Sequence, residues 1–376
     1  EPVHAGQPQV LRTKFWPIEL IEEICELLAP RAHERELELV CDIDSKVPDA
    51  CLGDPLRLRQ IVTNLLGNAI KYTEKGHVIL RATASALEND GVQLRVEVED
   101  TGFGIPEEQL QTMFEPFTQG DSFESRKQGG TGLGLAITKQ LVSLLGGEVN
   151  VTSKLGAGSK FWITIPFLLE KESAPAQPWQ SGVKNVLLVQ SDGYVVRTVT
   201  RMLEESGSEV STTRNGYEAF DLMVLQNFDL VIADEQLPDM NGYEFIDRVR
   251  SSAKSKSLAT ILMTTTKPAS AKLEHVSEPD ARISKPVRRP RLREAIERAL
   301  GRGDATDTVK QAAGGTPDLG LRVLLVEDSP VNREVASGML EALGCKVETA
   351  SDGSVGVEQA LSWGFDAVLM DCQMPL

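Results

Sequence analysis

The chain is 376 residues long with a formal net charge of −16, enough for two or three domains that each bury a core. The acidic balance disfavours a nucleic-acid or anionic-membrane partner, and an anionic ligand would need basic residues close to its site. The five cysteines are scattered without a C-x-x-C pair, which indicates reduced, structural thiols in a cytosolic protein.

The first block, residues 11–168, mixes the patterns of helices and strands. Apolar residues at helical spacing predict a long amphipathic helix over 54–73. Alternation of apolar and polar residues predicts strands over 77–85 and 92–100, and "KFWITIPFLL" predicts a third strand over 160–169. Helices and strands are therefore expected to share this domain.

The two later blocks repeat one unit. "VLLVQSD" from Val186 and "VLLVEDS" from Val323 begin copies that align without a gap, so that Gly207 falls on Gly344. Each copy has the pattern strand, helix, strand, helix, strand, with apolar strands typical of a parallel doubly wound sheet. We expect a complete first copy and a second copy that ends after its third strand.

These patterns and the Pro/Ser- and Gly-rich stretches between them predict the domain order. The predicted segments are the end of a helix over 1–10, a mixed α/β domain over 11–168, a linker over 169–182, the first repeated unit over 183–301, a linker over 302–320 and part of the second repeated unit over 321–376.

Glycines crowd the start of a helical pattern in "GGTGLGLAITKQLV", residues 129–142. Such glycines let backbone amides approach an anion, and the helix N-terminus adds partial positive charge, which predicts a phosphate cradle. On its own the stretch fits a flexible loop before a glycine-tolerant helix equally well. It is neither a Walker loop nor a dinucleotide motif.

Two upstream stretches favour the phosphate site. "NLLGNAIKY" places Asn64, Asn68 and Lys71 on one helix face, where amide oxygens can bind Mg²⁺ and the ammonium can meet phosphate. "DTGFGIP" ends a strand with Asp100, whose carboxylate can accept a hydrogen bond from the exocyclic amine of adenine.

With these stretches the first block resembles the ATP-binding lobe of bacterial sensor histidine kinases, within the GHKL ATPase superfamily. The asparagine box, first glycine box, phenylalanine box "FEPFTQGD" and second glycine box occur in family order. The resemblance implies a GHKL (Bergerat-type) α/β sandwich that binds ATP with Mg²⁺. It implies these ATP-binding residues: Asn64, Asn68, Lys71, Tyr72, Asp100, Gly102, Gly104, Ile105, Phe117, Arg126, Lys127, Gly130, Thr131, Gly132, Leu133 and Gly134.

Within that set the resemblance assigns particular roles. Asn64 would hold Mg²⁺, Asp100 would read adenine, and Asn64, Lys71 and Arg126 would be catalytic. Arg126 and Lys127 would belong to the ATP lid, although a solvated loop is the alternative for them. Members that hydrolyse ATP carry Glu four residues before the box asparagine, and this chain has Gln60 there, which cannot take a proton.

The repeated units resemble response-regulator receiver domains, with a flavodoxin-like, doubly wound sheet. In the second copy the resemblance assigns Glu327, Asp328 and Asp371 to Mg²⁺, with Asp371 as the phosphoacceptor.

The first copy departs from the receiver pattern. It keeps the acceptor match Asp234, the hydroxyl match Thr264 and Lys285, but Gln190 and Ser191 replace its acidic pair. Its switch position is Arg282 instead of an aromatic residue, and Asp192 and Glu235 lie one residue away from the ligand positions. Phosphorylation of Asp234 is therefore doubtful, and we expect a regulatory role for this copy.

Two further stretches were weighed. "HERELEL", residues 33–39, lacks the residues that follow the phosphoacceptor histidine in the kinase family, so a surface turn is expected. None of the four histidines matches that box. "RRPRLR", residues 288–293, is interpreted as a solvated helix start, with a basic patch for an anionic regulator as the alternative.

Three functions compete. The preferred one is the cytoplasmic core of a hybrid sensor histidine kinase in a phosphorelay; the others are a nucleotide-binding scaffold and a GHKL ATPase that hydrolyses ATP. The resemblance implies a dimerisation domain, a homodimeric full-length protein, a downstream phosphotransfer or response-regulator partner and no nucleic acid. Although the chain has no apolar run that spans a bilayer, the resemblance allows for inner-membrane association of a longer protein.

Overall fold

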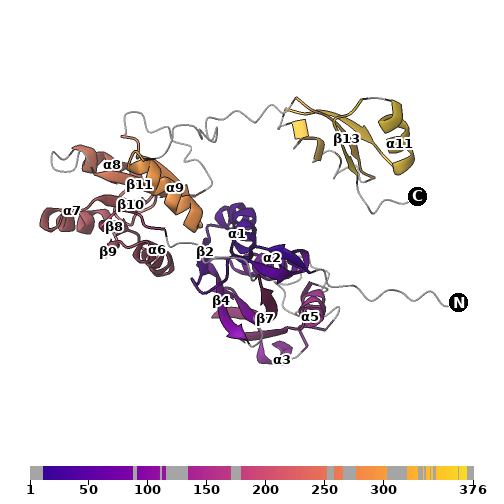
Figure 1. Ribbon diagram of the computed structural model, residues 1–376, viewed down its shortest axis with the longest axis horizontal. Coiled ribbons are helices and arrows are strands. Elements are labelled where there is room, and N and C mark those ends of the chain that lie inside the picture. Colours follow the sequence, from indigo (N-terminus) through magenta and orange to yellow (C-terminus); the bar gives the residue numbers. More distant parts are fainter. Residues whose placement is uncertain are drawn as a thin grey trace. The chain divides into compact units, whose positions relative to one another are not determined.

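The computed structural model describes residues 12–87, 91–110, 112–115, 134–170, 179–251, 258–265, 277–302, 320–328, 333, 336–338, 340–341, 344–362 and 364–370. The chain divides into two compact units, Glu1–Gly303 and Asp304–Leu376 (Figure 1). The expected helix end over 1–10 lies outside the described residues.

The first part of unit 1 is built on a seven-stranded sheet of order β1-β3-β7-β5-β4-β2, with β6 beside β7. Only the β2–β4 pair is parallel among the described pairs of this sheet. The strands are β1 (Thr13–Phe15), β2 (Glu38–Ile43), β3 (Cys51–Gly53), β4 (His77–Leu87), β5 (Gly91–Asp100), β6 (Glu148–Lys154) and β7 (Gly158–Leu169).

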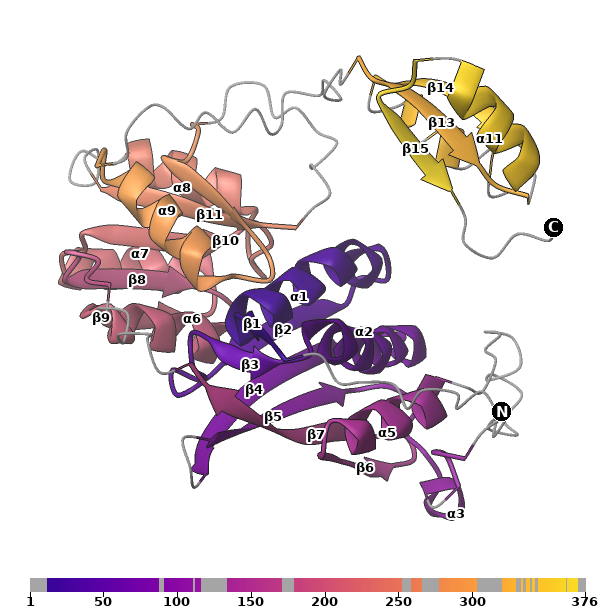
Figure 2. The ribbon, with the colours of Figure 1, turned by 45° about the vertical axis from the view of Figure 1, so that its right-hand side comes forward.

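Helices α1 (Pro17–Glu34), α2 (Pro55–Tyr72) and α5 (Gly134–Leu144) cover one face of this sheet, and the short α3 (Glu107–Leu110) follows β5 (Figure 2). Helix α2 begins after Asp54, whose carboxylate accepts from the Arg57 N–H at 3.2 Å. It ends at Thr73, whose hydroxyl donates to the Ala69 carbonyl at 2.7 Å. The core between helices and sheet confirms the predicted α/β sandwich, which we call the kinase lobe after its sequence resemblance.

The second part of unit 1 is a parallel five-stranded sheet of order β12-β11-β10-β8-β9, which we call the first receiver. This order confirms the flavodoxin-like expectation. Its elements are β8 (Asn185–Val189), α6 (Gly193–Glu205), β9 (Glu209–Thr213), α7 (Gly216–Leu225), β10 (Leu230–Asp234), α8 (Gly242–Ser251), β11 (Ala259–Thr264), β12 (Ala281–Ser284) and α9 (Arg289–Ala299).

Unit 2 repeats the start of that topology. Its described elements are β13 (Arg322–Val326), β14 (Lys346–Ala350), α11 (Gly353–Ser362) and β15 (Ala367–Met370). The strand order β14-β13-β15 is parallel and corresponds to β9-β8-β10 of the first receiver. The internal duplication read from the sequence is therefore present in the fold.

The stretch over 33–39 is the expected surface turn at its centre only. It contains the end of α1, an exposed turn at Arg35 and Glu36, where Glu36 has a φ of 57°, and the start of β2. Leu37 and Leu39 are buried in the lobe core. The expectation is confirmed at Arg35 and Glu36 and is wrong from residue 38 onward, where a strand begins.

Two glycines of the β6–β7 turn give a test of local crowding. Both Gly156 and Gly158 have positive φ, but a Cβ on Gly156 would meet nothing within 4 Å, whereas one on Gly158 would lie 2.0 Å from the Asp100 carbonyl oxygen. We expect Gly156→Ala to lower the unfolding free energy by roughly 1–2 kcal/mol through backbone strain. Gly158→Ala should lower it by about 1–3 kcal/mol more through overpacking. Urea denaturation of both variants measures the difference, and equal losses would contradict it.

Candidate functional site

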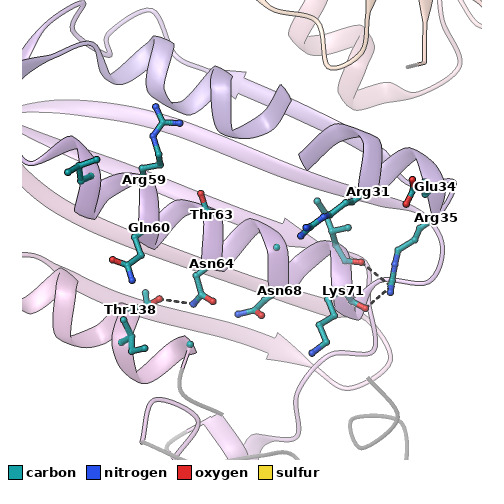
Figure 3. Close-up of a pocket in the computed structure, with 15 residues that line it drawn as sticks. Arg31, Glu34, Arg35, Arg59, Gln60, Thr63, Asn64, Asn68, Lys71 and Thr138 are labelled. Atoms are coloured by element: carbon teal, nitrogen blue, oxygen red, sulfur yellow. Dashed lines mark hydrogen bonds between the residues drawn. The ribbon is translucent and has the colours of Figure 1, made fainter. Parts of the chain in front are cut away.

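One face of α2 opens into a cavity of about 890 Å³. Asn64, Asn68 and Lys71 project into it from α2, as the helical spacing predicted, and Thr138 and Gly134 border it from α5. Figure 3 shows Gln60, Asn64, Asn68 and Lys71 on the same side of the helix. The structure thus brings these candidate residues together, with Asn64, Asn68 and Lys71 on α2 and Gly134 on α5.

Asn64 is held by α5. Its Nδ2 donates to the Thr138 Oγ1 at 2.8 Å, which directs the amide nitrogen toward α5 (Figure 3). A Cβ on Gly134 would lie 2.7 Å from the Asn64 Oδ1, so any larger residue there would displace the amide. Gly134 at the start of α5 therefore leaves the space that the Asn64 side chain occupies.

Basic side chains that the sequence reading missed surround the same cavity. Arg31 of α1, Arg35 at the C-cap of α1 and Arg59 of α2 line it together with Lys71, and among the described residues Glu34 is the one acid in the lining. Arg59 is paired with Glu23 and points away from Asn64 (Figure 3), so Lys71, Arg31 and Arg35 are the basic groups that can compensate an anionic ligand on this acidic chain.

Arg35 also joins the two helices at this end of the cavity. Its Nη1 donates to the Lys71 carbonyl at 2.8 Å and to the Ile70 carbonyl at 3.3 Å, which satisfies the last carbonyls of α2. The four-residue spacing of Arg31 and Arg35 was a detectable signal for one basic helix face, but their partner helix could not be read from it.

Asp100 lies at the end of β5 beside the last turn of α2 and is not among the residues that line the cavity. Its Oδ1 accepts from the backbone N–H of Gly102 at 2.8 Å and of Ser159 at 3.3 Å. Burial raises the pKa of Asp100, and the two N–H bonds oppose that rise. The pKa of Asp100 stays raised, so the two backbone donors offset only part of the cost of burying the charged carboxylate.

The loop after Asp100 is closely packed. A Cβ on Gly102 would lie 2.3 Å from the Tyr72 carbonyl oxygen, and one on Gly104 would lie 2.1 Å from the Lys154 carbonyl oxygen. The Ile105 N–H donates to the Ser153 Oγ at 2.7 Å. These contacts fix the first glycine box between α2 and β6. The remaining candidates, Phe117, Arg126, Lys127 and Gly130–Leu133, lie outside the described residues.

In the first receiver, Asp234 is buried at the end of β10 and already has donors. Its Oδ2 accepts from the Gln190 amide and from the Lys285 Nζ at 3.0 Å, and its Oδ1 accepts from the Gln236 N–H at 3.2 Å. Lys285 Nζ also donates to Glu38 Oε2 of the kinase lobe at 2.9 Å. The carboxylate is thus satisfied by protein groups.

The neighbouring acids do not replace the missing pair. The Asp192 carboxylate caps α6, where its Oδ1 accepts from the Tyr194 N–H at 2.8 Å. Glu235 is buried, which raises its pKa. At the switch position, the Arg282 guanidinium pairs with Glu278 and lies 5.5 Å from the centre of the Tyr243 ring.

The second receiver presents Glu327 and Asp328 directly after β13, and Asp371 lies outside the described residues. Among the residues that the structure describes, no group of three His, Cys, Asp or Glu side chains is placed to hold a metal ion. Within the same residues, no helix combines the length and apolar character needed to cross a membrane.

Comparison with known families agrees with both folds. Residues 53–169 match the family described as histidine kinase-, DNA gyrase B- and HSP90-like ATPase, and residues 186–297 and 323–376 match the response regulator receiver domain. The chain therefore has an ATPase domain of the histidine kinase type followed by two stretches of the receiver family. Curated relatives that it matches are named sensor histidine kinases.

Similarity to individual relatives extends over nearly the full chain. The sensor histidine kinase GacS of Pseudomonas protegens is 32% identical over 99% of the chain, and the signal transduction histidine-protein kinase BarA of Escherichia coli is 32% identical over 94% of it. The crystal structure of full-length ShkA in complex with AMPPNP aligns with 99% of the chain and 74% of that chain, at 28% identity and a TM-score of 0.61. The chain spans about two fifths of the curated relatives, 41% of GacS and 38% of BarA.

The raised pKa of Asp100 predicts a stability difference that depends on pH. A carboxyl with a raised native pKa destabilises the fold in its ionised form, so the penalty is absent below the ordinary aspartate pKa and complete above the raised one. Asp100→Asn should therefore unfold at higher urea concentration than the wild type at pH 7, with a difference that shrinks as the pH falls.

Asp229 provides the matched control. Its carboxylate also accepts two backbone N–H bonds, from Lys184 at 3.1 Å and Asn185 at 2.9 Å, but its side chain is exposed. Asp229→Asn should give no gain in stability toward neutral pH. A gain as large as that of Asp100→Asn would rule out burial as the cause.

Proposed function

We propose that the kinase lobe binds Mg-ATP and transfers its γ-phosphoryl group to a histidine outside this chain, from which it passes to a receiver aspartate. The observation that carries the proposal is the ordered face of α2, where Asn64 is held by Thr138 beside Lys71 in a cavity lined with arginines. The nucleotide complex of the similar ShkA structure supports it.

Different residues would contact the metal ion, the phosphates and the adenine of the ligand. The Asn64 Oδ1 would hold the Mg²⁺ that ATP brings, and Lys71 would meet phosphate oxygens with Asn68 beside it. Asp100, whose Oδ1 is oriented by the Gly102 and Ser159 N–H bonds, would accept from the exocyclic amine of adenine. Arg126 and the glycines of the second glycine box would complete the phosphate contacts, as the family resemblance implies.

Transfer to a protein fits the site better than hydrolysis does. Gln60 lines the cavity one helical turn before Asn64, at the position where hydrolysing relatives need a carboxylate base. An amide cannot remove a proton from water at neutral pH, so the site lacks that general base. The four histidines of the chain do not match the family's acceptor box, so the acceptor belongs to a dimerisation domain of the longer protein.

The two receivers would then differ in role. The second, over 321–376, would accept the phosphoryl group on Asp371 with Mg²⁺ held by Glu327 and Asp328, and would pass it to a downstream partner. The first, over 183–301, would be regulatory because the Asp234 carboxylate already accepts hydrogen bonds from Gln190 and Lys285. The kinase lobe itself would extend over 11–168.

The nucleotide assignment predicts selective binding. Calorimetry on the full chain should show Mg-ATP bound more tightly than Mg-GTP, and Asn64→Ala should weaken Mg-ATP by about tenfold or more, equivalent to ~1.4 kcal/mol. Asn150→Ala, an exposed asparagine on β6 of the same lobe, should bind as the wild type does. Equal affinity for the two nucleotides, or an unchanged Asn64→Ala, would contradict the assignment.

We predict that the first receiver is not phosphorylated at Asp234. With a small phosphodonor and Mg²⁺, peptide mapping of the full chain should find no phosphoaspartate at Asp234. The reason is that the site lacks two carboxylates, each of which would attract the Mg²⁺ ion by several kcal/mol at ~4 Å. The variant Gln190→Glu/Ser191→Asp restores those carboxylates and should label Asp234. Labelling of the wild type to the same extent as the variant would show that the site is a working acceptor.

A further inference from the structure

Strand β2 turns its two faces to two different neighbours. Leu39 and Cys41 point into the core of the kinase lobe. Val40, one residue out of phase, is buried in a second core cluster together with Ile79 of β4 and with Val195 and Val199 of the first receiver. Alternate residues of one strand therefore serve the cores of two domains.

Charged contacts surround this apolar centre, with acids and carbonyls on the lobe and arginines on the receiver. Arg201 of α6 contacts the Asp42 Oδ1 at 2.6 Å and donates to the Ile43 carbonyl at 2.9 Å. At the start of α9, the Arg288 guanidinium lies 3.0 Å from the Glu26 carboxylate, and Arg289 donates to the Ile43 carbonyl at 3.3 Å. The "RRPRLR" run thus faces protein with its first two arginines.

Lys285 lies where the interface meets the degenerate acceptor site. Its ammonium contacts Asp234 Oδ2 at 3.0 Å within its own domain and Glu38 Oε2 of the lobe at 2.9 Å, and only 6% of its side chain is exposed. Burial raises the pKa of Glu38, and Lys285 opposes that rise. The lobe therefore supplies a second carboxylate to a site that has lost its own acidic pair.

We propose that the face of the first receiver formed by α6 and the segment from Lys285 to Arg289 is a docking surface for β2 and β4 of the kinase lobe, with Lys285 as its central bond. This inference rests on the regulatory role proposed above and specifies the surface through which it acts. Val40 and Ile79 are the apolar part of the lobe's surface, and Glu38, Asp42 and Glu26 are the acidic part.

The substitution at Gln190 makes this role possible. Its amide donates to Asp234 and satisfies that carboxylate without a metal ion, so Lys285 remains between Asp234 and Glu38. In a working receiver the lysine has to meet the phosphoryl group. In this chain Glu38 and Asp234 already take two of the three N–H donors of that ammonium, so docking competes with a phosphoryl group on Asp234 for Lys285.

Hydrogen exchange on the full chain tests the surface. In the wild type, amides of β2 and of residues 285–289 should exchange slowly. Glu38→Gln and Lys285→Met should each raise exchange in both segments together, by about tenfold or more, because a bond between them is lost. Glu244→Gln, which breaks the exposed pair with Arg248 inside the receiver, is the matched control and should leave β2 unchanged.

A second variant and a folding monitor separate docking from damage. Val40→Thr keeps the shape of the side chain but places a hydroxyl in the apolar centre, and it should reproduce the same two-segment change. Protection of α2 and β10 must remain as in the wild type, which shows that both domains stay folded. Unchanged β2 exchange in Glu38→Gln, Lys285→Met and Val40→Thr would overturn the proposal.

The result is independent of the nucleotide assignment. Asn64→Ala should lose Mg-ATP affinity and keep β2 protected, because Asn64 lies on the cavity side of the lobe. Normal Mg-ATP binding by a wild-type chain whose β2 exchanges freely would refute docking alone. Protected β2 without nucleotide binding would refute the kinase function alone.

Discussion

Burial of one face of α2 determines where the chemistry of the kinase lobe can lie. The helix packs its apolar residues into the core, and the 3.6-residue period leaves its polar residues on the opposite side. Asn64, Asn68 and Lys71 are therefore placed by the packing of residues that never touch a ligand. Thr138 adds the orientation of one amide, and Arg35 holds the carbonyl end of the helix.

Much of this could be predicted from the sequence because it follows from periodicity. The alignment of Asn64, Asn68 and Lys71 needs only the helical repeat, and the receiver topology follows from a duplicated pattern of buried strands. The arginines of the cavity could not be predicted, because Arg31 and Arg35 reach it from another helix whose packing angle is a tertiary property.

The strand that begins within 33–39 was missed for a related reason. Leucines that alternate with charged residues are typical of a strand with one solvated face, and the expectation of a turn over the whole stretch neglected that period. What no local pattern could reveal is that the outward residues Glu38 and Val40 meet a second domain more than a hundred positions later in the chain. A valine among charges on a strand's outer face is a weak signal of such a partner.

The edge position of β2 bears on how the protein can be divided. Among the described strands β2 is the last of its sheet and pairs only with β4. The first receiver packs over the outward face of β2 and β4, where the Val40 side chain of β2 is 3% exposed and the Ile79 side chain of β4 is 1% exposed. An expression fragment that stopped at the linker after β7 would combine uncovered aliphatic side chains with an open strand edge, which favours edge-to-edge association. The smallest fragment of this chain without that exposed face therefore reaches through α9, and the chain is best divided between the two receivers.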